Sequence, residues 1–173
     1  MTIVEMSPLV TPVSATELRS DDSLATSLLA LNNAHASELS WLTPEALAHL
    51  IRQAWRAWRI GEADALLIAL DQTVDYDSPN YHWFRARYDR FIYVDRIVVA
   101  QSARGRGLAR VLYEQLVRDA QAADHQRIVC EVNVDPPNPQ SDAFHAALGF
   151  EPLATASIHG GTKTVRYLIK PLS

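Results

Sequence analysis

Cysteine is almost absent from this 173-residue sequence, which contains only Cys130. One cysteine cannot form an internal disulfide, and Cys130 has no neighbours at the spacing of metal ligands, so a disulfide-stapled fold and a cysteine-ligated zinc site are excluded. The histidines are scattered, without cysteine or carboxylate partners at metal-site spacing, and we expect no bound metal. Cys130 lies in an apolar strand pattern and is predicted to be a small core residue.

Long apolar runs are missing as well. No run is long enough to span a bilayer, and residues 1–7 lack the basic stretch and the apolar stretch of a secretory signal. The net charge of −4 and the dispersed arginines argue against a large basic surface for nucleic acid. We therefore expect a soluble cytoplasmic protein that binds neither membranes nor nucleic acid.

The apolar residues that are present recur at two spacings. Helical spacing predicts helices over residues 24–33, 44–53, 108–122 and 139–148. Strand patterns cover residues 10–15, 55–60, 65–70, 91–99 and 127–134, and a hairpin follows at 151–158 and 162–169. Because the chain shows no repeat, linker or low-complexity tract, residues 1–173 are predicted to form one domain of mixed strands and helices.

One connection is too long for a tight hairpin. Residues 71–90, here called the aromatic segment, hold five aromatic side chains: Tyr76, Tyr81, Trp83, Phe84 and Tyr88. A connection of this length is seldom passive. Two interpretations stay open at this point: the rings cover the core, or the segment forms a lid or wall over an acceptor site. Pro79 and Asn80 predict a turn followed by a short helix.

The stretch Arg104-Gly105-Arg106-Gly107-Leu108-Ala109 joins a predicted strand to a predicted helix. The first N–H groups of a helix have no partner inside the helix, and the helix dipole adds partial positive charge there. Glycine lets a ligand approach the backbone closely, and arginine adds charge-assisted contacts. The stretch therefore predicts a seat for a phosphate or pyrophosphate.

Two motifs resemble those of the GNAT acyltransferase superfamily. The pattern [QR]-x-x-G-x-[GA] is matched by Arg104, Gly107 and Ala109, and the segment from Asn138 to Phe150 is similar to the family's N-x-x-A-x-x-[LF]-Y-x-x-x-G-F. The resemblance covers about residues 65–169. It implies an α/β (α+β) fold with a mixed, mainly antiparallel, strongly twisted central sheet and helices on both faces.

The resemblance also implies a co-substrate, acetyl-CoA, and a reaction, direct attack of an amine on its thioester. The main chain of Ile97, Val98 and Val99 is expected to pair with the pantetheine arm and donate to the thioester oxygen. The pyrophosphate is expected at Arg104, Gly105, Arg106, Gly107, Leu108 and Ala109. Further contacts to CoA are expected from Asn138, Ser141 and Phe144.

The catalytic positions depart from the family pattern. His145 stands where the family usually has tyrosine, and histidine is able to protonate the departing thiolate; the alternative is a ring that packs against CoA or caps a carbonyl. Tyr93 stands where the family often has a glutamate base. Asp95, two residues on, and Glu131, on the parallel neighbour, are the carboxylate candidates for a base. A salt-bridge role for each, and a water chain with no dedicated base, stay open.

The expected activity is that of an N-acetyltransferase acting on a small-molecule or peptide amine. Two alternatives are kept: an acyltransferase with a longer acyl-CoA or a non-amine acceptor, and a CoA-binding sensor or partner protein with little turnover. The missing glutamate and the tyrosine-to-histidine change keep the sensor alternative open. A homodimer is compatible with the resemblance.

Overall fold

The computed structural model describes residues 7–173, and the chain divides into two compact units. The first unit runs up to Ile68 and includes Arg96–Leu116; the second consists of Ala69–Asp95 and Val117–Ser173. Three elements continue from one unit into the other: β3 (Ala65–Asp71), β4 (Ile92–Val99) and α5 (Leu108–Ala122).

Seven strands form one sheet in the order β1-β2-β3-β4-β5-β7-β6. The remaining strands are β1 (Val10–Pro12), β2 (Arg56–Ile60), β5 (Arg127–Asp135), β6 (Glu151–Ile158) and β7 (Lys163–Pro171). The β1–β2, β5–β7 and β6–β7 pairs are antiparallel, whereas β4 and β5 run parallel. The prediction of a mixed, mainly antiparallel sheet is therefore confirmed.

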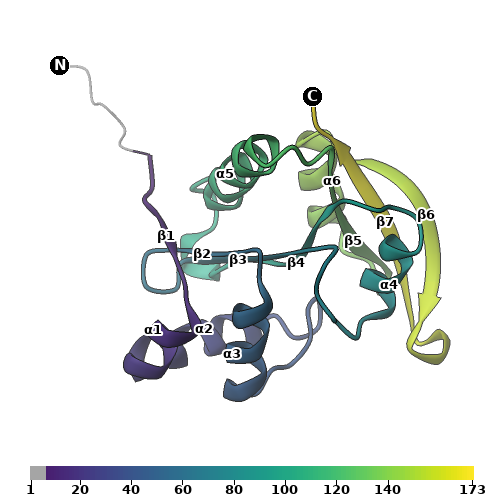
Figure 1. The fold of residues 1–173 in the computed structure, drawn as a ribbon. Helices are drawn as coiled ribbons and strands as arrows, with labels where there is room; N and C mark the ends of the chain where they lie inside the picture. The colour runs from purple at the N-terminus through teal and green to yellow at the C-terminus, as the bar shows by residue number, and fades with distance from the viewer. Residues whose placement is uncertain (1–6) are drawn as a thin grey trace. The chain divides into compact units, whose positions relative to one another are not determined.

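In the first unit, three helices lie on one side of β1, β2 and β3, and the first half of α5 lies on the other (Figure 1). They are α1 (Ala15–Ser20), α2 (Asp22–Asn33) and α3 (Pro44–Gln53). The predicted start of α3 is confirmed, because the Thr43 side chain accepts from the Ala46 N–H. The sequence patterns did not predict α1, whose six residues are too few to show a helical period.

The loop from α2 to α3 is held by a buried arginine. Arg96 is only 4% exposed and donates to Oδ1 of Asn32 at 2.8 Å and to Oγ of Ser40 at 2.7 Å. Asn33 Oδ1 accepts from the Leu42 N–H at 2.9 Å. These polar side chains at the end of α2 therefore fix the backbone of the connection to α3.

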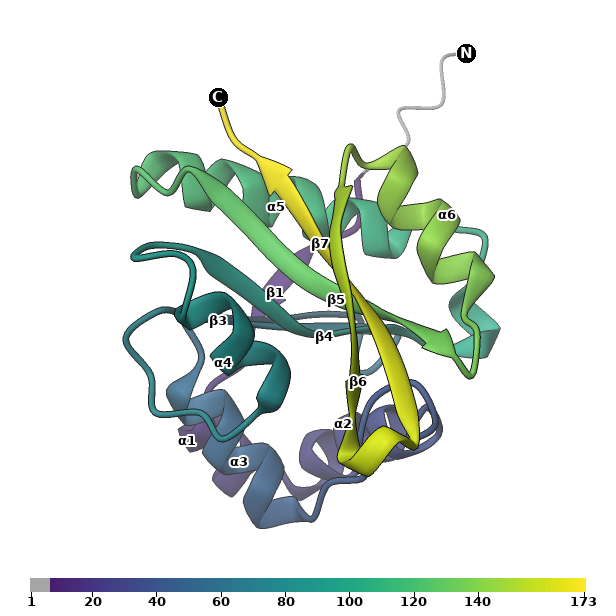
Figure 2. The ribbon, with the colours of Figure 1, turned by 90° about the vertical axis from the view of Figure 1, so that its right-hand side faces the viewer.

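In the second unit, α4 (Pro79–Arg85) and α6 (Pro139–Ala147) cover opposite faces of β5 and β7, as Figure 2 shows. Trp83 of α4 stacks on Tyr167 of β7, with ring centroids 4.2 Å apart. The neighbouring residue, Arg166, points to the other face and donates to Asp142 of α6 at 2.9 Å. The alternation of side chains along a strand explains this division.

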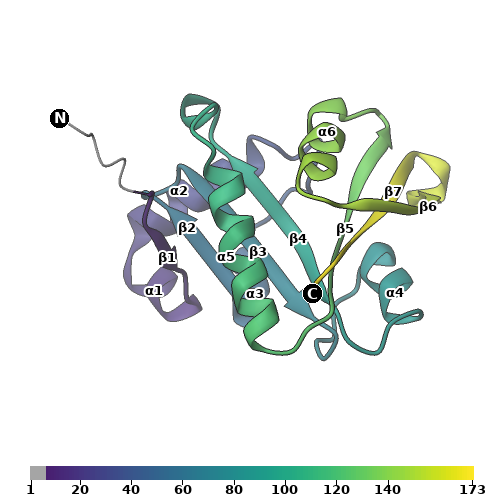
Figure 3. The same cartoon turned by 90° about the horizontal axis from the view of Figure 1, so that it is seen from above.

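The C-terminal part follows the sequence predictions closely. Asn138 caps the start of α6 by accepting from the Ser141 N–H. Gly149, with φ +85°, follows the C-cap residue Leu148 and ends the helical stretch. Strands β6 and β7 form a hairpin, visible in Figure 3. Cys130 is buried, as predicted. No helix in the described part of the chain combines the length and apolar character that a membrane span requires.

The aromatic segment covers the core of the second unit. Tyr81 and Phe84 are fully buried, and their rings contact those of Phe91 and Tyr93 at centroid distances of 5.6–6.3 Å. The Tyr81 hydroxyl donates to the Asp71 carbonyl at 2.7 Å, which ties α4 to the end of β3. The core-cover interpretation is thus confirmed, and the predicted short helix after Pro79 is present as α4.

Candidate functional site

The predicted phosphate loop lies wholly in the first unit and is exposed from Arg104 to Gly107. Gly105 and Gly107 have φ of +78° and +71°, a left-handed conformation that favours glycine. A Cβ built at either position meets nothing within 4 Å, so the space in front of the backbone is open. Gly107 directly precedes α5 and has no side chain of its own that could cap the helix, whose first N–H groups have no partner inside the helix.

The two arginines of this loop are oriented by neighbours in the first unit. Arg106 forms an ion pair with Asp64 at 3.3 Å. Arg104 donates to Nε2 of His35 at 3.3 Å, and Nδ1 of His35 lies 3.0 Å from the Leu31 carbonyl. A carbonyl only accepts, so His35 carries its proton on Nδ1 and offers a lone pair to Arg104. Both guanidinium groups therefore stand at an exposed loop suited to a diphosphate.

A hollow of about 450 Å³ adjoins Arg104 in the first unit. His35, Glu38, Ala100 and Gln101 also line it. Just before Ala100, the predicted pantetheine strand alternates: Val98 is buried, whereas Ile97 and Val99 keep some exposed surface. The loop and the end of β4 together offer main-chain donors, two guanidinium groups and open space, which fits the phosphates and arm of CoA.

The second unit contains two partly buried carboxyl groups, Glu131 and Asp95, which with the nearby Tyr93 are here called the carboxyl centre. β4 and β5 pair at Ile92–Ile128 and Tyr93–Val129, and Glu131 comes two residues beyond the last of these pairs. Oε1 of Glu131 accepts from the Tyr93 hydroxyl and from the Asn80 amide, each at 3.0 Å. Oε2 is buried and has no hydrogen-bond partner within residues 7–173. One oxygen of the carboxyl thus has two donors, while the other has none among the described residues.

A second carboxyl group lies on the same face. Asp95 is two residues beyond Tyr93 on β4, and its Oδ1 accepts from the Tyr76 hydroxyl at 2.7 Å. Its negative charge acts on Glu131. The predicted candidates Tyr93, Asp95 and Glu131 are therefore brought together.

Burial and neighbouring charges shift the pKa values of Glu131 and Tyr93 in this centre. Burial, followed by the charge of Asp95, raises the pKa of Glu131 to about 8, against the opposing effect of the Tyr93 and Asn80 hydrogen bonds and of Lys163. The residue keeps some exposed surface, although Oε2 is enclosed. Burial and the nearby Glu131 raise the pKa of Tyr93 well above its ordinary value, so Tyr93 stays a neutral donor.

His145 lies in α6, also in the second unit, and is 3% exposed. Its Nδ1 is 2.7 Å from the Ser141 carbonyl and 3.3 Å from Oγ of Ser141, so Nδ1 carries a proton. Burial lowers the pKa of His145, partly offset by the Ser141 carbonyl and Asp142. The ring packs edge-on against Phe144 and Phe150. Burial therefore favours the neutral form of the imidazole.

Two of the predicted CoA contacts, Ser141 and Phe144, contact this ring, and the third, Asn138, caps the start of α6. Asn138 uses Oδ1 to cap the helix, which leaves its amide NH₂ for other partners. Ser141 faces His145 one turn on, as its spacing predicts, and Phe144 precedes the ring.

Sequence reasoning missed Asn80 and Tyr76, both in the aromatic segment. The only feature of the sequence that pointed to these residues was the unusual length and aromatic content of the connection that carries them. Among the described residues, no group of three or more His, Cys, Asp or Glu is placed to bind a metal ion.

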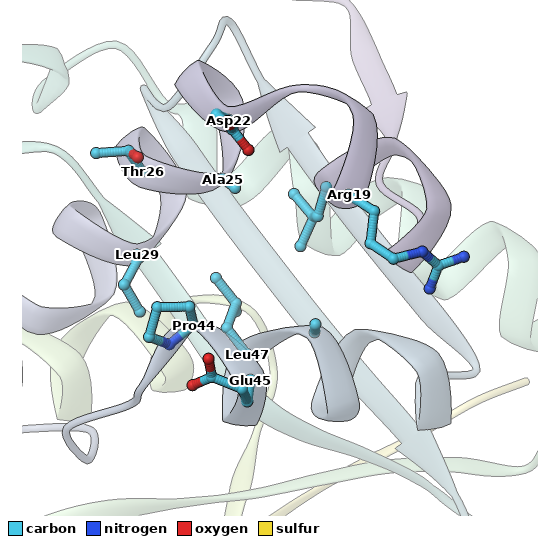
Figure 4. A pocket seen from close by; sticks show the side chains of 10 residues that line it. Arg19, Asp22, Ala25, Thr26, Leu29, Pro44, Glu45 and Leu47 are labelled. Atoms are coloured by element: carbon cyan, nitrogen blue, oxygen red, sulfur yellow. The ribbon is translucent and has the colours of Figure 1, made fainter.

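A further hollow of about 500 Å³ lies among α1, α2 and α3, and its lining includes none of the predicted site residues (Figure 4). Leu29, Pro44 and Leu47 gather between α2 and α3, while the Arg19 side chain is directed away from them.

Comparisons with known proteins agree with this geometry. The sequence pattern of the acetyltransferase (GNAT) family matches residues 47–150, more than half of the chain. A comparison with curated protein sequences finds no match.

The chain also resembles solved structures along nearly all of its length. The NatC complex bound to Gag peptide and CoA aligns with a TM-score of 0.70 and 16% identity, covering 97% of this chain and 100% of that chain. Naa20 of Chaetomium thermophilum in complex with a bisubstrate analogue aligns with a TM-score of 0.69 and 16% identity, covering 95% of this chain and 86% of that chain. Ard1 of Thermoplasma volcanium aligns with a TM-score of 0.69 and 11% identity, covering 97% of this chain and 99% of that chain. These likenesses show the fold, and with the family match they establish that the chain belongs to the GNAT acetyltransferase family.

Proposed function

We propose that this chain is an acetyl-CoA-dependent N-acetyltransferase in which a primary amine attacks the thioester carbonyl directly. The observation that supports this most is Glu131, whose Oε1 is held by two donors while the buried Oε2 has no partner within residues 7–173. Buried polar atoms in purely structural roles are almost always paired. A carboxyl with a pKa of about 8 is matched to removing a proton from an amine near neutral pH.

In the proposed reaction, Glu131 accepts the proton that the amine must lose. A nitrogen–carbon bond then forms at the thioester carbonyl as the carbon–sulfur bond breaks, and CoA leaves as a thiolate that takes up a proton. Negative charge develops on the carbonyl oxygen, for which the main chain of residues 97–99 supplies the proposed donor. Holding both substrates in place supplies much of the rate, on the order of 7–11 kcal/mol at best.

The first unit supports the CoA-binding part of the proposal. Gly105 and Gly107, with their left-handed backbone and open space, and the start of α5 suit a diphosphate, with Arg104 and Arg106 as side-chain donors. Leu108 and Ala109 contribute their backbone N–H groups as the first residues of that helix. Asn138, Ser141 and Phe144 are the proposed contacts to the rest of CoA.

The catalytic roles are divided by charge. Tyr93 acts as a neutral donor to Glu131, and Asp95 acts through its negative charge on the same carboxyl. His145 is the proposed proton donor to the thiolate through Nε2. Because Nδ1 holds the proton of the neutral ring and burial lowers the pKa of His145, this role requires Nε2 to take up a proton from solvent, which it then passes to the thiolate.

The proposed acceptor is a small-molecule or peptide amine. A peptide is present in the NatC complex and a bisubstrate analogue in the Naa20 complex, both of which share this fold. The experiment that tests the function measures thiol release from acetyl-CoA with a panel of amines and peptides, using Glu131→Gln as the inactive comparison.

Release that depends on both an amine and Glu131 supports the proposal. CoA binding measured by calorimetry without turnover for any acceptor would instead support the sensor alternative. Faster turnover with propionyl-CoA or butyryl-CoA would support the longer-acyl alternative.

A further inference from the structure

The aromatic segment contributes one hydrogen-bond donor to each carboxyl of the buried centre. Asn80 donates to Oε1 of Glu131 at 3.0 Å, and the Tyr76 hydroxyl donates to Oδ1 of Asp95 at 2.7 Å. Both donors come from a connection between β3 and β4 and not from the sheet itself. The carboxyl groups, by contrast, are placed by β4 and β5.

The orientation of Asn80 follows from its second contact. Its Oδ1 accepts from the Tyr167 hydroxyl at 3.1 Å, and Tyr167 lies directly opposite Glu131 in the β5–β7 pairing. Oε1 of Glu131 accepts both in the ionised carboxylate and as the carbonyl oxygen of the neutral acid, so the amide presents its NH₂ to Glu131 and its oxygen to Tyr167. Asn80 is itself 8% exposed, so water does not readily replace either contact.

The helix that carries Asn80 is held rigidly. Trp83 and Phe84 both pack on Tyr167, at centroid distances of 4.2 Å and 5.2 Å. Ser78 caps α4 by accepting from the Tyr81 N–H at 3.3 Å. Asn80 is therefore positioned by the same rings that cover the core.

We propose that the aromatic segment positions the base of the reaction, with Asn80 holding the Glu131 carboxyl and Tyr76 holding the Asp95 carboxyl. The catalytic meaning of this inference rests on the proposed function. Tyr76 stabilises the charged form of Asp95, and that charge disfavours ionisation of Glu131. Asn80 and Tyr93 limit the effect by donating to Glu131, and Lys163 adds positive charge. Asn80 and Tyr76 are positioning residues in this scheme.

The test titrates the carboxyl groups by NMR in full-length protein labelled with ¹³C at glutamate and aspartate, with Glu131→Gln and Asp95→Asn assigning the signals. Asn80→Ala is expected to raise the pKa of Glu131 by about one unit, because a donor to the charged form is lost. Tyr76→Phe is expected to lower the pKa of Glu131, because loss of a donor to Asp95 weakens the negative charge that acts on Glu131. His82→Ala, an exposed change on the same helix, is the matched control and should leave the pKa of Glu131 unchanged.

Equal Glu131 titrations in Asn80→Ala, His82→Ala and the unmodified protein would overturn the inference. If Asn80→Ala fails to fold, Tyr167→Phe removes the hydroxyl that orients Asn80 without opening a large cavity, and a smaller upward shift is expected; no shift would again overturn it. The rise of kcat/KM with pH should move to higher pH by the same amount as the titration. If the unmodified protein has no transferase activity, the proposed function fails, while the NMR titration still decides the role of Asn80.

Discussion

Tyr93 of β4 donates its hydroxyl to Oε1 of Glu131 on β5 across 3.0 Å. The two residues lie at the end of the only parallel pairing described in the second unit, between β4 and β5. Because the phenol occupies Oε1 and stays neutral, it directs any incoming proton to Oε2.

The first prediction concerns the loss of the base. Glu131→Gln keeps the shape of the side chain and its contacts with Tyr93 and Asn80 but cannot accept a proton. We expect kcat at pH 8 to fall by about 10²–10⁴-fold, the usual contribution of general acid–base catalysis. Steady-state thiol release from acetyl-CoA measures this fall in kcat. Glu151→Gln, at an exposed position of β6, is the control and should retain full activity. Normal turnover in Glu131→Gln would remove Glu131 from the chemistry.

The second prediction concerns pH. Since Glu131 must be ionised to act, kcat/KM should rise with pH up to about 8 and then level off. The charge of Asp95 raises the pKa of Glu131, so Asp95→Asn should move the rise to lower pH. The same acceptor is used for both proteins, so that titration of the amine cancels. An unshifted profile would show that Asp95 does not act on the base.

The third prediction concerns stability. The pKa of Glu131 is about 8 in the folded protein and about 4.3 in an unfolded chain. The folded state thus binds the proton more tightly, and this stabilisation is complete below about pH 4 and is lost as pH rises through 8.

Glu131→Gln removes this dependence. Its free energy of unfolding relative to the unmodified protein should increase between pH 5 and pH 9, by about 2 kcal/mol after allowing for the partial exposure of the residue. Urea unfolding at several pH values measures the difference. A constant difference across this range would mean that Glu131 titrates normally.

The fourth prediction concerns the phosphate loop. Gly107 has φ +71° and open space around its Cβ position, and Gly160 in the β6–β7 turn has φ +66° and equally open space. Changing either to alanine should cost about 1–2 kcal/mol of stability through the left-handed backbone. Only Gly107→Ala should also weaken CoA binding, by roughly tenfold or about 1.4 kcal/mol, because its methyl group stands before the helix N–H groups. Isothermal calorimetry with CoA separates the two variants, and equal affinities would contradict the loop assignment.

The fifth prediction concerns His145. His145→Phe keeps a ring to pack between Phe144 and Phe150 but has no nitrogen to carry a proton. We expect turnover to fall well beyond any change in acetyl-CoA affinity. If turnover is unchanged, the histidine serves packing alone.

Much of this fold was predictable from local patterns. The period of the apolar residues placed the long helices and strands, and caps such as Thr43 and Asn138 marked their starts. The phosphate loop was also predictable, because its chemistry depends on consecutive residues, glycines followed by a helix start, and needs no distant partner.

The carboxyl centre was decided by the tertiary structure. The sequence put Tyr93 and Asp95 forward as catalytic residues and offered Glu131 only as another candidate for the base, because strand register and depth of burial, which set the pKa of each carboxyl, are not visible in it. The sequence did not mark Asn80 and Tyr76 as site residues, because each contacts a carboxyl that lies far along the chain. Asn80 is 51 residues from Glu131, and Tyr76 is 19 residues from Asp95. Local sequence determines backbone conformation through nearby contacts, whereas the protonation of a buried group depends on every charge and dipole that the folded chain brings around it.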